Sequence, residues 1–422
     1  MATPSSPLAP RGACPTLDDP MRVADGLLAR FRPQAGLRPG QVAALADAAE
    51  AHGNGRIEVT ARGNLQVRGL SETSAPTFRA TLVQAGIAAQ PAPAIEISPI
   101  AGEDPKAAAD PRALAERLRA VCAAALAEGP LSPKLAIVLL SGGQVLLGGL
   151  KADIRLVAVS TGWGLELGGN TLGGLAESDV PGAVAAILKA LQAVGPRARG
   201  SDLDAARIAR GLAGLSPLPL IDVRPPSAVA GPLSLASGPG LRVGLPFGQM
   251  RAWQMRELAR LMAEHGAVEA RTAPDRTLVL TGFSAGALRD LAPALATAGF
   301  RTRPDANAAR LSICSGAERG PGGVIQAAEL AQALVAVDRE LADGSFHLHV
   351  STCAKGCPHA GRPGIVLEGN GLRLYRAEGT KPLASLDPEA IETGVVSLAR
   401  RIRDTRQPGE TTLSVFGRLG HR

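Results

Sequence analysis

The sequence predicts a mixed α/β (α+β) fold made by tandem duplication, and three observations predict it. Landmark residues of the first half recur in the second half at a constant offset of 213 positions. Each half alternates segments with the apolar period of a helix and segments with the alternation of a strand. Proline-rich stretches near residues 90–105 and 216–232 join the parts. We therefore expect a pseudo-two-fold body of four domains, over residues 16–90, 91–232, 233–305 and 306–422.

The smaller unit of each half is predicted to start with a strand and a helix. Two short strands follow, over residues 57–61 and 64–69 in the first half and 268–272 and 277–282 in the second. A second helix then ends at a glycine, the residue that most often follows a helix C-terminus. The positions that share the offset include a histidine, a glutamine and this glycine: His52 and His265, Gln41 and Gln254, Gly86 and Gly299.

The larger unit of each half repeats as well. A predicted helix over residues 109–128 matches one over 323–344, and a predicted strand over 133–140 matches one over 346–353. Each half should therefore hold a small α/β unit followed by a larger sheet and helix domain.

Composition narrows the class of protein. Five cysteines, an odd number with one close pair, do not form a disulfide framework. No apolar run is long enough to span a membrane, and the N-terminus lacks the apolar core of a signal peptide. We expect a soluble, cytoplasmic protein with reduced thiols and no membrane partner.

The net charge of +7 comes mostly from arginine, which provides 39 of the 45 basic residues. A guanidinium group binds carboxylates and phosphates through two parallel hydrogen bonds. The basic residues are dispersed and aromatic residues make up only 2% of the chain, so few side chains could stack on nucleic-acid bases. A small polycarboxylate is the expected ligand, and nucleic acid is not.

One predicted strand of the first half carries polar side chains at every second position: Arg62, Asn64, Gln66 and Arg68. Side chains two residues apart on a strand share one face. Arg30 should lie on an adjacent strand, so this face could bind several carboxylates. The alternative is a solvated polar face of an antiparallel sheet.

Cys353 and Cys357 form a C-x3-C pair in a glycine-rich loop with Lys355. A thioredoxin-like dithiol would need C-x-x-C. Zinc would need four ligands, and the nearby candidates are His347, His349 and His359. Half of an iron–sulfur site, in which backbone N–H groups donate to cluster sulfurs, and two structural thiols also remain open.

Three segments resemble the nitrite/sulfite reductase superfamily, and within it the branch that serves cobalamin biosynthesis: residues 11–33, 52–69 and 349–361. The resemblance covers nearly the whole chain. It implies a tandem repeat of ferredoxin-like half-domains, with a tetrapyrrole held by cationic side chains of one half and an iron–sulfur cluster held by the other. It further implies a monooxygenase that hydroxylates precorrin-3A and forms a lactone, with electrons from a donor such as NADH or a reductase.

The resemblance also implies roles for single residues. The substrate-binding residues would be Arg30, Arg62, Asn64, Gln66, Arg68 and Lys134, and the cluster ligands would be Cys314, Cys353 and Cys357. It assigns no catalytic residue.

The chain departs from the family at Gly320, where members carry a fourth cysteine. Three thiolates could hold a 4Fe–4S cluster with an open iron, Glu318 or His359 could supply the fourth ligand, or the cluster is lost. A separate mononuclear non-haem iron is compatible with the resemblance, and sirohaem fits less well. The alternatives are a sirohaem-dependent nitrite or sulfite reductase and a non-catalytic tetrapyrrole-binding protein.

Overall fold

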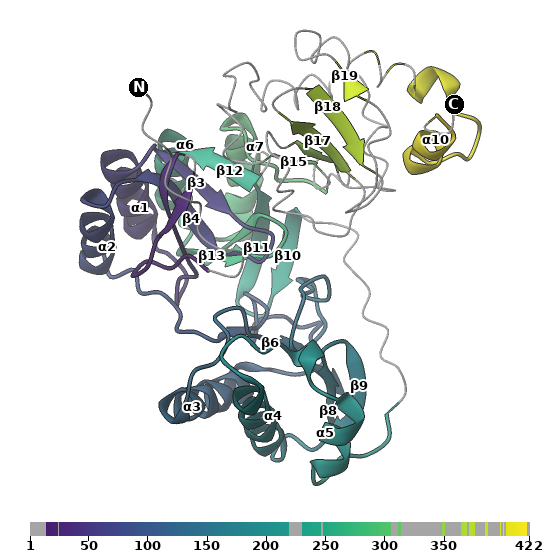
Figure 1. Ribbon diagram of the computed structural model, residues 1–422. Coiled ribbons are helices and arrows are strands. Elements are labelled where there is room, and N and C mark those ends of the chain that lie inside the picture. Colours follow the sequence, from purple (N-terminus) through teal and green to yellow (C-terminus); the bar gives the residue numbers. More distant parts are fainter. Residues whose placement is uncertain are drawn as a thin grey trace, which may run out of the picture.

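The computed structural model describes residues 14–23, 25–218, 230–245 and 248–304, and shorter segments after them: 311–313, 348–350, 364–368, 371–375, 385–386, 397, 400 and 402–419. Among these residues, no helix is both long enough and apolar enough to cross a bilayer. Figure 1 shows two helix-flanked sheets side by side, with a third sheet below them.

The first half-domain is an antiparallel sheet with two helices on one face. Its elements are β1 (Met21–Val23), β2 (Gly26–Phe31), α1 (Pro39–His52), β3 (Arg56–Val59), β4 (Leu65–Leu70) and α2 (Ser74–Gln84). The strand order is β1-β2-β4-β3. Alternate strand residues, such as Ile57, Val59 and Val67, are buried against α1 and α2, so the intervening residues lie on the opposite face.

The second half-domain repeats this arrangement. Its elements are β10 (Gly231–Leu235), β11 (Gly238–Gly244), α6 (Ala252–Glu264), β13 (Glu269–Ala273), β14 (Thr277–Thr281) and α7 (Ala285–Thr297). Gly86 and Gly299 both adopt positive φ, at 72° and 92°. Gln41 and Gln254 each accept a hydrogen bond from the backbone at the start of their helix and donate one to the backbone beside these glycines. The predicted duplication is confirmed.

The two half-domains also exchange backbone pairs. Strand β12 (Gln249–Arg251) of the second half joins the sheet of the first half, where Met250 pairs with Ile57. Leu37 of the first half pairs with Ala270 of β13, with two backbone hydrogen bonds of 2.8 Å. These are the same contact in the two copies, related by the offset of 213. Helices α1 and α6 pack together, and one continuous core contains residues of both half-domains.

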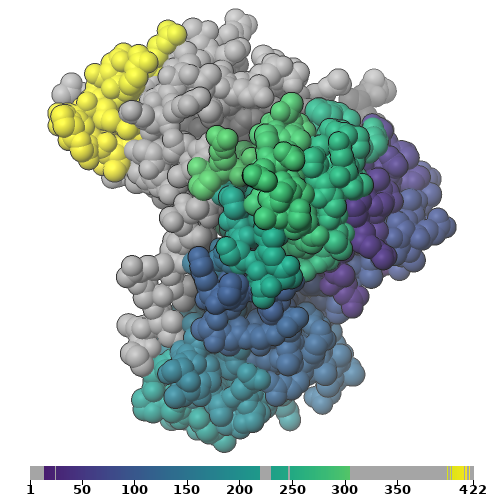
Figure 2. Space-filling model, turned by 180° about the vertical axis from the view of Figure 1, so that it is seen from behind, coloured from purple at the N-terminus to yellow at the C-terminus, as the bar shows by residue number. Residues whose placement is uncertain are grey.

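A larger sheet domain follows the first half-domain. It contains β5 (Ala94–Glu96), α3 (Arg112–Glu128), β6 (Ala136–Leu140), β7 (Ile154–Val159), β8 (Gly162–Leu167), β9 (Asn170–Leu175), α4 (Val180–Val194) and the short α5 (Ala205–Gly211). Strands β5, β6 and β7 are parallel, and β8 and β9 extend the sheet in antiparallel order. Helices α3 and α4 cover one face. Figure 2 shows this domain, in blue and teal, below the two half-domains.

The last quarter of the chain is described only in part. Strands β15 (Leu311–Ile313) and β16 (Leu348–Val350) are parallel neighbours, and β16 lies within the predicted strand 346–353. Strands β17 (Gly364–Glu368), β18 (Gly371–Tyr375) and β19 (Ser385–Leu386) form an antiparallel sheet, and α10 (Thr412–Leu419) follows. The parallel pair followed by an antiparallel hairpin repeats the order of β5 to β8. The predicted helix over 323–344 lies outside the described residues.

Candidate functional site

The candidate site is the face of the first half-domain sheet that is turned away from α1 and α2. The strand register brings Arg30 of β2 opposite Gln66 of β4, and Gln66 opposite Glu58 of β3. Next to this row, Arg251 of β12 pairs with Arg56. We call this surface the arginine face and define it by Arg30, Arg56, Glu58, Gln66, Arg68 and Arg251.

Gln66 connects two charged groups of opposite sign across the face. Its side-chain oxygen accepts hydrogen bonds from Arg30 Nε and Nη2, at 2.9 and 2.7 Å. Its Nε2 donates to Glu58 Oε2 at 2.9 Å. Because the carboxylate can only accept, it fixes the orientation of the amide, and the amide oxygen in turn holds the Arg30 guanidinium. The other oxygen of Glu58 is buried and has no hydrogen-bond partner among the described residues.

The rest of the face carries closely spaced positive charges. Arg68 is held by Asp25, from the turn between β1 and β2, through bonds of 2.8 and 3.0 Å. The pKa of Arg56 is lowered to about 10, mainly by burial and next by the charge of Arg251. Only 4% of Gln66 and 9% of Arg68 is exposed. Gln66 and Arg68 are therefore not solvated, and both have the partners that polar groups this deep need.

Arg62 and Asn64 lie elsewhere than the alternation predicts. Strand β4 begins at Leu65, so both residues belong to the turn between β3 and β4. Arg62 reaches the neighbouring sheet domain, where Nη1 donates to the Lys151 carbonyl at 2.8 Å. The alternation of a strand does not apply to Arg62 and Asn64, because the chain turns there. Gly63, at φ 83°, takes the left-handed conformation of this turn.

A buried ion pair lies beside this turn. Arg32 contacts Glu96 of β5, Nη1 to Oε2, at 2.5 Å, and Arg62 approaches the same carboxylate at 3.5 Å. Arg32 also donates to Asn64 Oδ1 at 3.2 Å. Burial lowers the pKa of Arg32, while the Glu96 charge raises it. These contacts join the first half-domain to the sheet domain.

Lys134, the last of the predicted substrate-binding residues, makes no described side-chain contact with the arginine face. It is exposed in the turn before β6, which begins at Ala136 rather than at the predicted residue 133. Within the described part of the chain, its side chain makes no hydrogen bond or ion pair.

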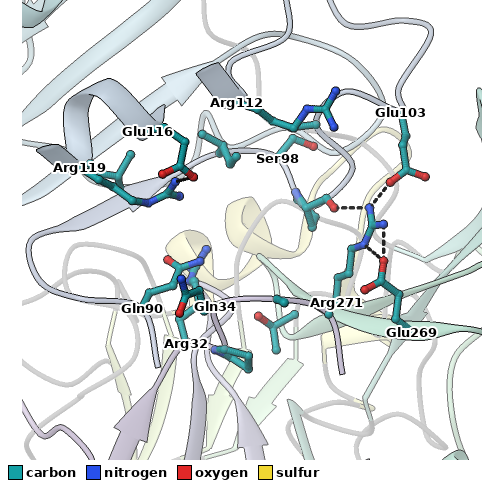
Figure 3. A pocket seen from close by; sticks show the side chains of 18 of the residues that line it. Arg32, Gln34, Gln90, Ser98, Glu103, Arg112, Glu116, Arg119, Glu269 and Arg271 are labelled. Atoms are coloured by element: carbon teal, nitrogen blue, oxygen red, sulfur yellow. Dashed lines mark hydrogen bonds and ion pairs between the residues drawn. The ribbon is translucent and has the colours of Figure 1, made fainter. Parts of the chain in front are cut away.

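A cavity of about 480 Å³ lies close to the Arg32 ion pair. Figure 3 shows Arg32, Gln34 and Gln90 on one side of it and α3 residues on the other. Arg271 of β13 bonds to Glu269 and Glu103 at its edge. The cavity joins three domains, and its arginines are paired with carboxylates: Arg32 with Glu96, Arg112 with Asp110, Arg119 with Glu116, and Arg271 with Glu269 and Glu103. We regard the arginine face as the candidate site because it brings Arg30, Arg56 and Arg68 together on three adjacent strands.

The two halves use the corresponding sheet face differently. The counterpart of Gln66 is Val279, which is buried with Ile100 and Val145 of the sheet domain. The second half-domain thus packs this face against a neighbouring domain, whereas the first half-domain fills it with charged side chains.

The three predicted cluster ligands, Cys314, Cys353 and Cys357, lie outside the described residues, as does Gly320. The strands that precede them are described. Ile313 pairs with Val350 in parallel register, so β15 and β16 end at the same edge. Cys314 follows β15 directly in the sequence, and Cys353 follows β16 after two residues. The assignment of these three cysteines as cluster ligands stays a prediction.

Sequence reasoning missed four charged residues near the predicted set: Arg32, Arg56, Glu58 and Glu96. Three of them had a signal. Arg56 and Glu58 alternate with period two in the strand before the polar one, and Arg32 stands two positions after Arg30. Glu96 had none, because it comes from another domain.

Comparisons with known proteins agree with the observed fold. Residues 19–85 match the family model described as nitrite/sulfite reductase ferredoxin-like half domain. The chain is 36% identical over 429 aligned positions to a precorrin-3B synthase of Sinorhizobium sp., an alignment that covers 97% of this chain and 93% of that protein. It is similar in structure to NirA of Mycobacterium tuberculosis, with a TM-score of 0.66, 18% identity, and coverage of 93% of this chain and 83% of that one.

Proposed function

The chain belongs to the precorrin-3B synthase family, and from that premise we propose that it is a monooxygenase that hydroxylates precorrin-3A with molecular oxygen to give precorrin-3B. A ring acetate of the substrate closes a lactone in the product. The electrons come from a donor such as NADH or a reductase.

The arginine face is the proposed substrate site. Precorrin-3A is a macrocycle with acetate and propionate groups around its rim, so it presents many carboxylates to the protein. Arg30, Arg56 and Arg68 project from three adjacent strands, and a guanidinium can hold a carboxylate through two hydrogen bonds. A macrocycle laid on the sheet would meet several of them at once.

Symmetry between the halves supports a position for the metal centre. The Val279 face of the second half-domain packs against the first sheet domain. By the pseudo-two-fold relation, the arginine face should lie opposite the second sheet domain, which carries the cysteines. The contact of Val279 with Ile100 and Val145 carries the proposal, because the same contact repeated in the first half would bring the arginine face next to the domain that carries the cysteines.

Cys314, Cys353 and Cys357 would hold the iron–sulfur cluster, with Glu318 or His359 as candidates for the fourth position. When bound, such a cluster supplies single electrons. The described residues have other tasks: the arginines hold substrate carboxylates, Gln66 orients Arg30, and Glu58 fixes Gln66.

The experiment is a turnover assay on anaerobically purified protein whose iron and acid-labile sulfide have been measured. Precorrin-3A, a chemical reductant and heavy-isotope oxygen are added, and the product is analysed by mass spectrometry. A mass gain of one labelled oxygen atom is expected, with no product when oxygen is left out. A protein that binds the macrocycle without turnover after cluster reconstitution would be a non-catalytic binder. Intense sirohaem absorption with reduction of nitrite or sulfite would identify a reductase instead.

A further inference from the structure

The turn between β13 and β14 has an unusual backbone. Asp275 and Arg276 both have φ of 60°, a left-handed conformation that is uncommon for residues other than glycine. They are the only described residues besides glycine with positive φ. The first half-domain has the same three-residue turn, and there Gly63 occupies the position that corresponds to Arg276. The second copy therefore holds an arginine where the first holds the residue that this backbone favours.

The Arg276 side chain is accommodated by a second glycine. A Cβ at Gly248 would lie 2.1 Å from Arg276 Cδ, so any other residue at 248 would displace the arginine. The backbone around it is tied down as well: Leu245 donates its N–H to the Arg276 carbonyl at 3.3 Å. The turn therefore combines a left-handed arginine with a neighbouring glycine that leaves room for the arginine side chain. Outliers of this kind cost of order 1–3 kcal/mol and are concentrated at functional sites.

The neighbours of Arg276 show where its charge lies. Gly248, which lies against the Arg276 side chain, is followed by Gln249, and Gln249 pairs with Glu58 of the arginine face. The charges that act on Arg276 agree with this position, because they are those of Asp275, Glu58 and Arg301. Burial lowers the pKa of Arg276 to about 10, and the two carboxylates oppose this effect. The guanidinium therefore remains positively charged at neutral pH. Its closeness to Glu58 extends the arginine face across the boundary between the two halves.

We propose that Arg276 is a substrate-binding residue contributed by the second half-domain, and that it binds one rim carboxylate of the tetrapyrrole beside the row formed by Arg30, Gln66 and Glu58. This inference rests on the proposed function. It assigns to the second half a direct share in the substrate site, in addition to its predicted metal site. Because the residue touches only the rim, it contributes to affinity and orientation rather than to the chemistry.

The test uses Arg276→Gly, because glycine is the residue that the left-handed turn favours. The variant removes the guanidinium and relieves the backbone at once, so the thermal midpoint should stay within a few degrees of that of the wild type. Binding of precorrin-3A is measured anaerobically from its absorbance, which prevents turnover. We expect the dissociation constant to rise by about 10- to 100-fold, the range for loss of one charged hydrogen-bonding group. The dependence of binding on salt concentration should become shallower, because one ionic contact is lost.

Asp275→Gly is the contrasting variant, since it makes the same backbone change at the adjacent residue but removes a carboxylate and keeps the Arg276 side chain. Its dissociation constant should not rise, whereas that of Arg276→Gly should. Arg276→Asn, which also tolerates the left-handed region, repeats the test if the glycine variant does not fold.

The possible failures can be told apart. Wild-type protein that does not bind precorrin-3A overturns both the proposed function and this inference. Wild-type protein that binds, together with Arg276 variants that bind equally tightly and keep the wild-type salt dependence, overturns this inference alone.

Discussion

Arg30 and Gln66 are joined across two antiparallel strands by a pair of hydrogen bonds that share the Gln66 side-chain oxygen. The arginine is thus held in one orientation before any ligand arrives. Such preorganisation reduces the conformational entropy that binding would otherwise cost. It can be tested separately from the charge of the arginine itself.

Replacing Gln66 by leucine should weaken substrate binding while the arginine is retained. The variant keeps most of the buried volume but removes the acceptor of Arg30 and the donor to Glu58. We expect KM for precorrin-3A to rise by about tenfold and the free energy of unfolding to fall by about 1–3 kcal/mol, the cost of unsatisfied buried groups. Steady-state kinetics and urea unfolding measure the two effects.

Gln192→Leu is the control for this prediction. Gln192 donates to the carbonyls of Ala125 and Gly129 at the end of α3, away from the arginine face. Its loss should lower stability similarly and leave KM unchanged. An unchanged KM in Gln66→Leu would show that Arg30 and Gln66 do not contribute to substrate binding.

Replacing Glu58 by glutamine should strengthen binding of the polyanion. The amide oxygen of glutamine can still accept from Gln66 Nε2, but the negative charge on the face is removed. Two like unit charges about 4 Å apart repel by about 1 kcal/mol when water screens them fully, and removing that repulsion corresponds to at least roughly fivefold tighter binding. Titration of the variant with precorrin-3A at low and moderate salt checks this, and weaker binding at both would contradict it. Glu257→Gln, at a half-exposed position of α6, is the control and should leave binding of precorrin-3A unchanged.

Replacing Glu96 by alanine should destabilise the protein, because it leaves Arg32 buried without its counter-ion. Only 2% of the Glu96 side chain and 13% of the Arg32 side chain is exposed. Removing one partner of a buried pair costs about 3–5 kcal/mol, measurable as a lower denaturation midpoint. Glu72→Ala removes an exposed ion pair with Arg22 and should cost less than about 1 kcal/mol. Equal effects of the two substitutions would mean that the Arg32 pair is not a buried link between the domains.

Substitutions at the thiols test the metal assignment. Cys357→Ser should abolish cluster iron and acid-labile sulfide. Cys122→Ser should leave them unchanged, because Cys122 is buried in the sheet domain and burial raises its thiol pKa to about 11. Gly320→Cys should increase iron content and slow its loss in air, since it supplies the fourth thiolate of the family. Iron content that is the same in wild type, Cys357→Ser and Gly320→Cys would exclude these positions as ligands.

The sequence predicted the parts of the fold that leave a local pattern. Repeated landmarks such as Gln41 and Gln254 identified the duplication, and alternation placed Gln66 and Arg68 on one face with Arg30. The same rule misplaced Arg62, because alternation ends where a turn begins. The signal for the turn was Gly63, which takes the left-handed conformation that the chain needs there.

Other features could not be predicted in this way. Leu37 pairs with Ala270, which is far from it in the sequence. The apolar periodicity of a segment predicts its own secondary structure and not its distant partners. The ion pair of Arg32 with Glu96 likewise depends on how two domains meet. The sequence did contain a signal for Arg276. The offset of 213 aligns it with Gly63, and an arginine in the place of a turn glycine is an unusual substitution.

The reciprocal backbone pairing between the half-domains has a consequence for how the chain could be divided. Leu37 completes an edge of the second sheet, and Met250 completes an edge of the first. A chain cut between residues 218 and 230 would leave each piece with an open strand edge and half of a shared core. Two such fragments made together in one cell should associate, because each supplies the strand residues and the apolar surface that the other lacks. The single chain is, in this respect, a covalently linked dimer.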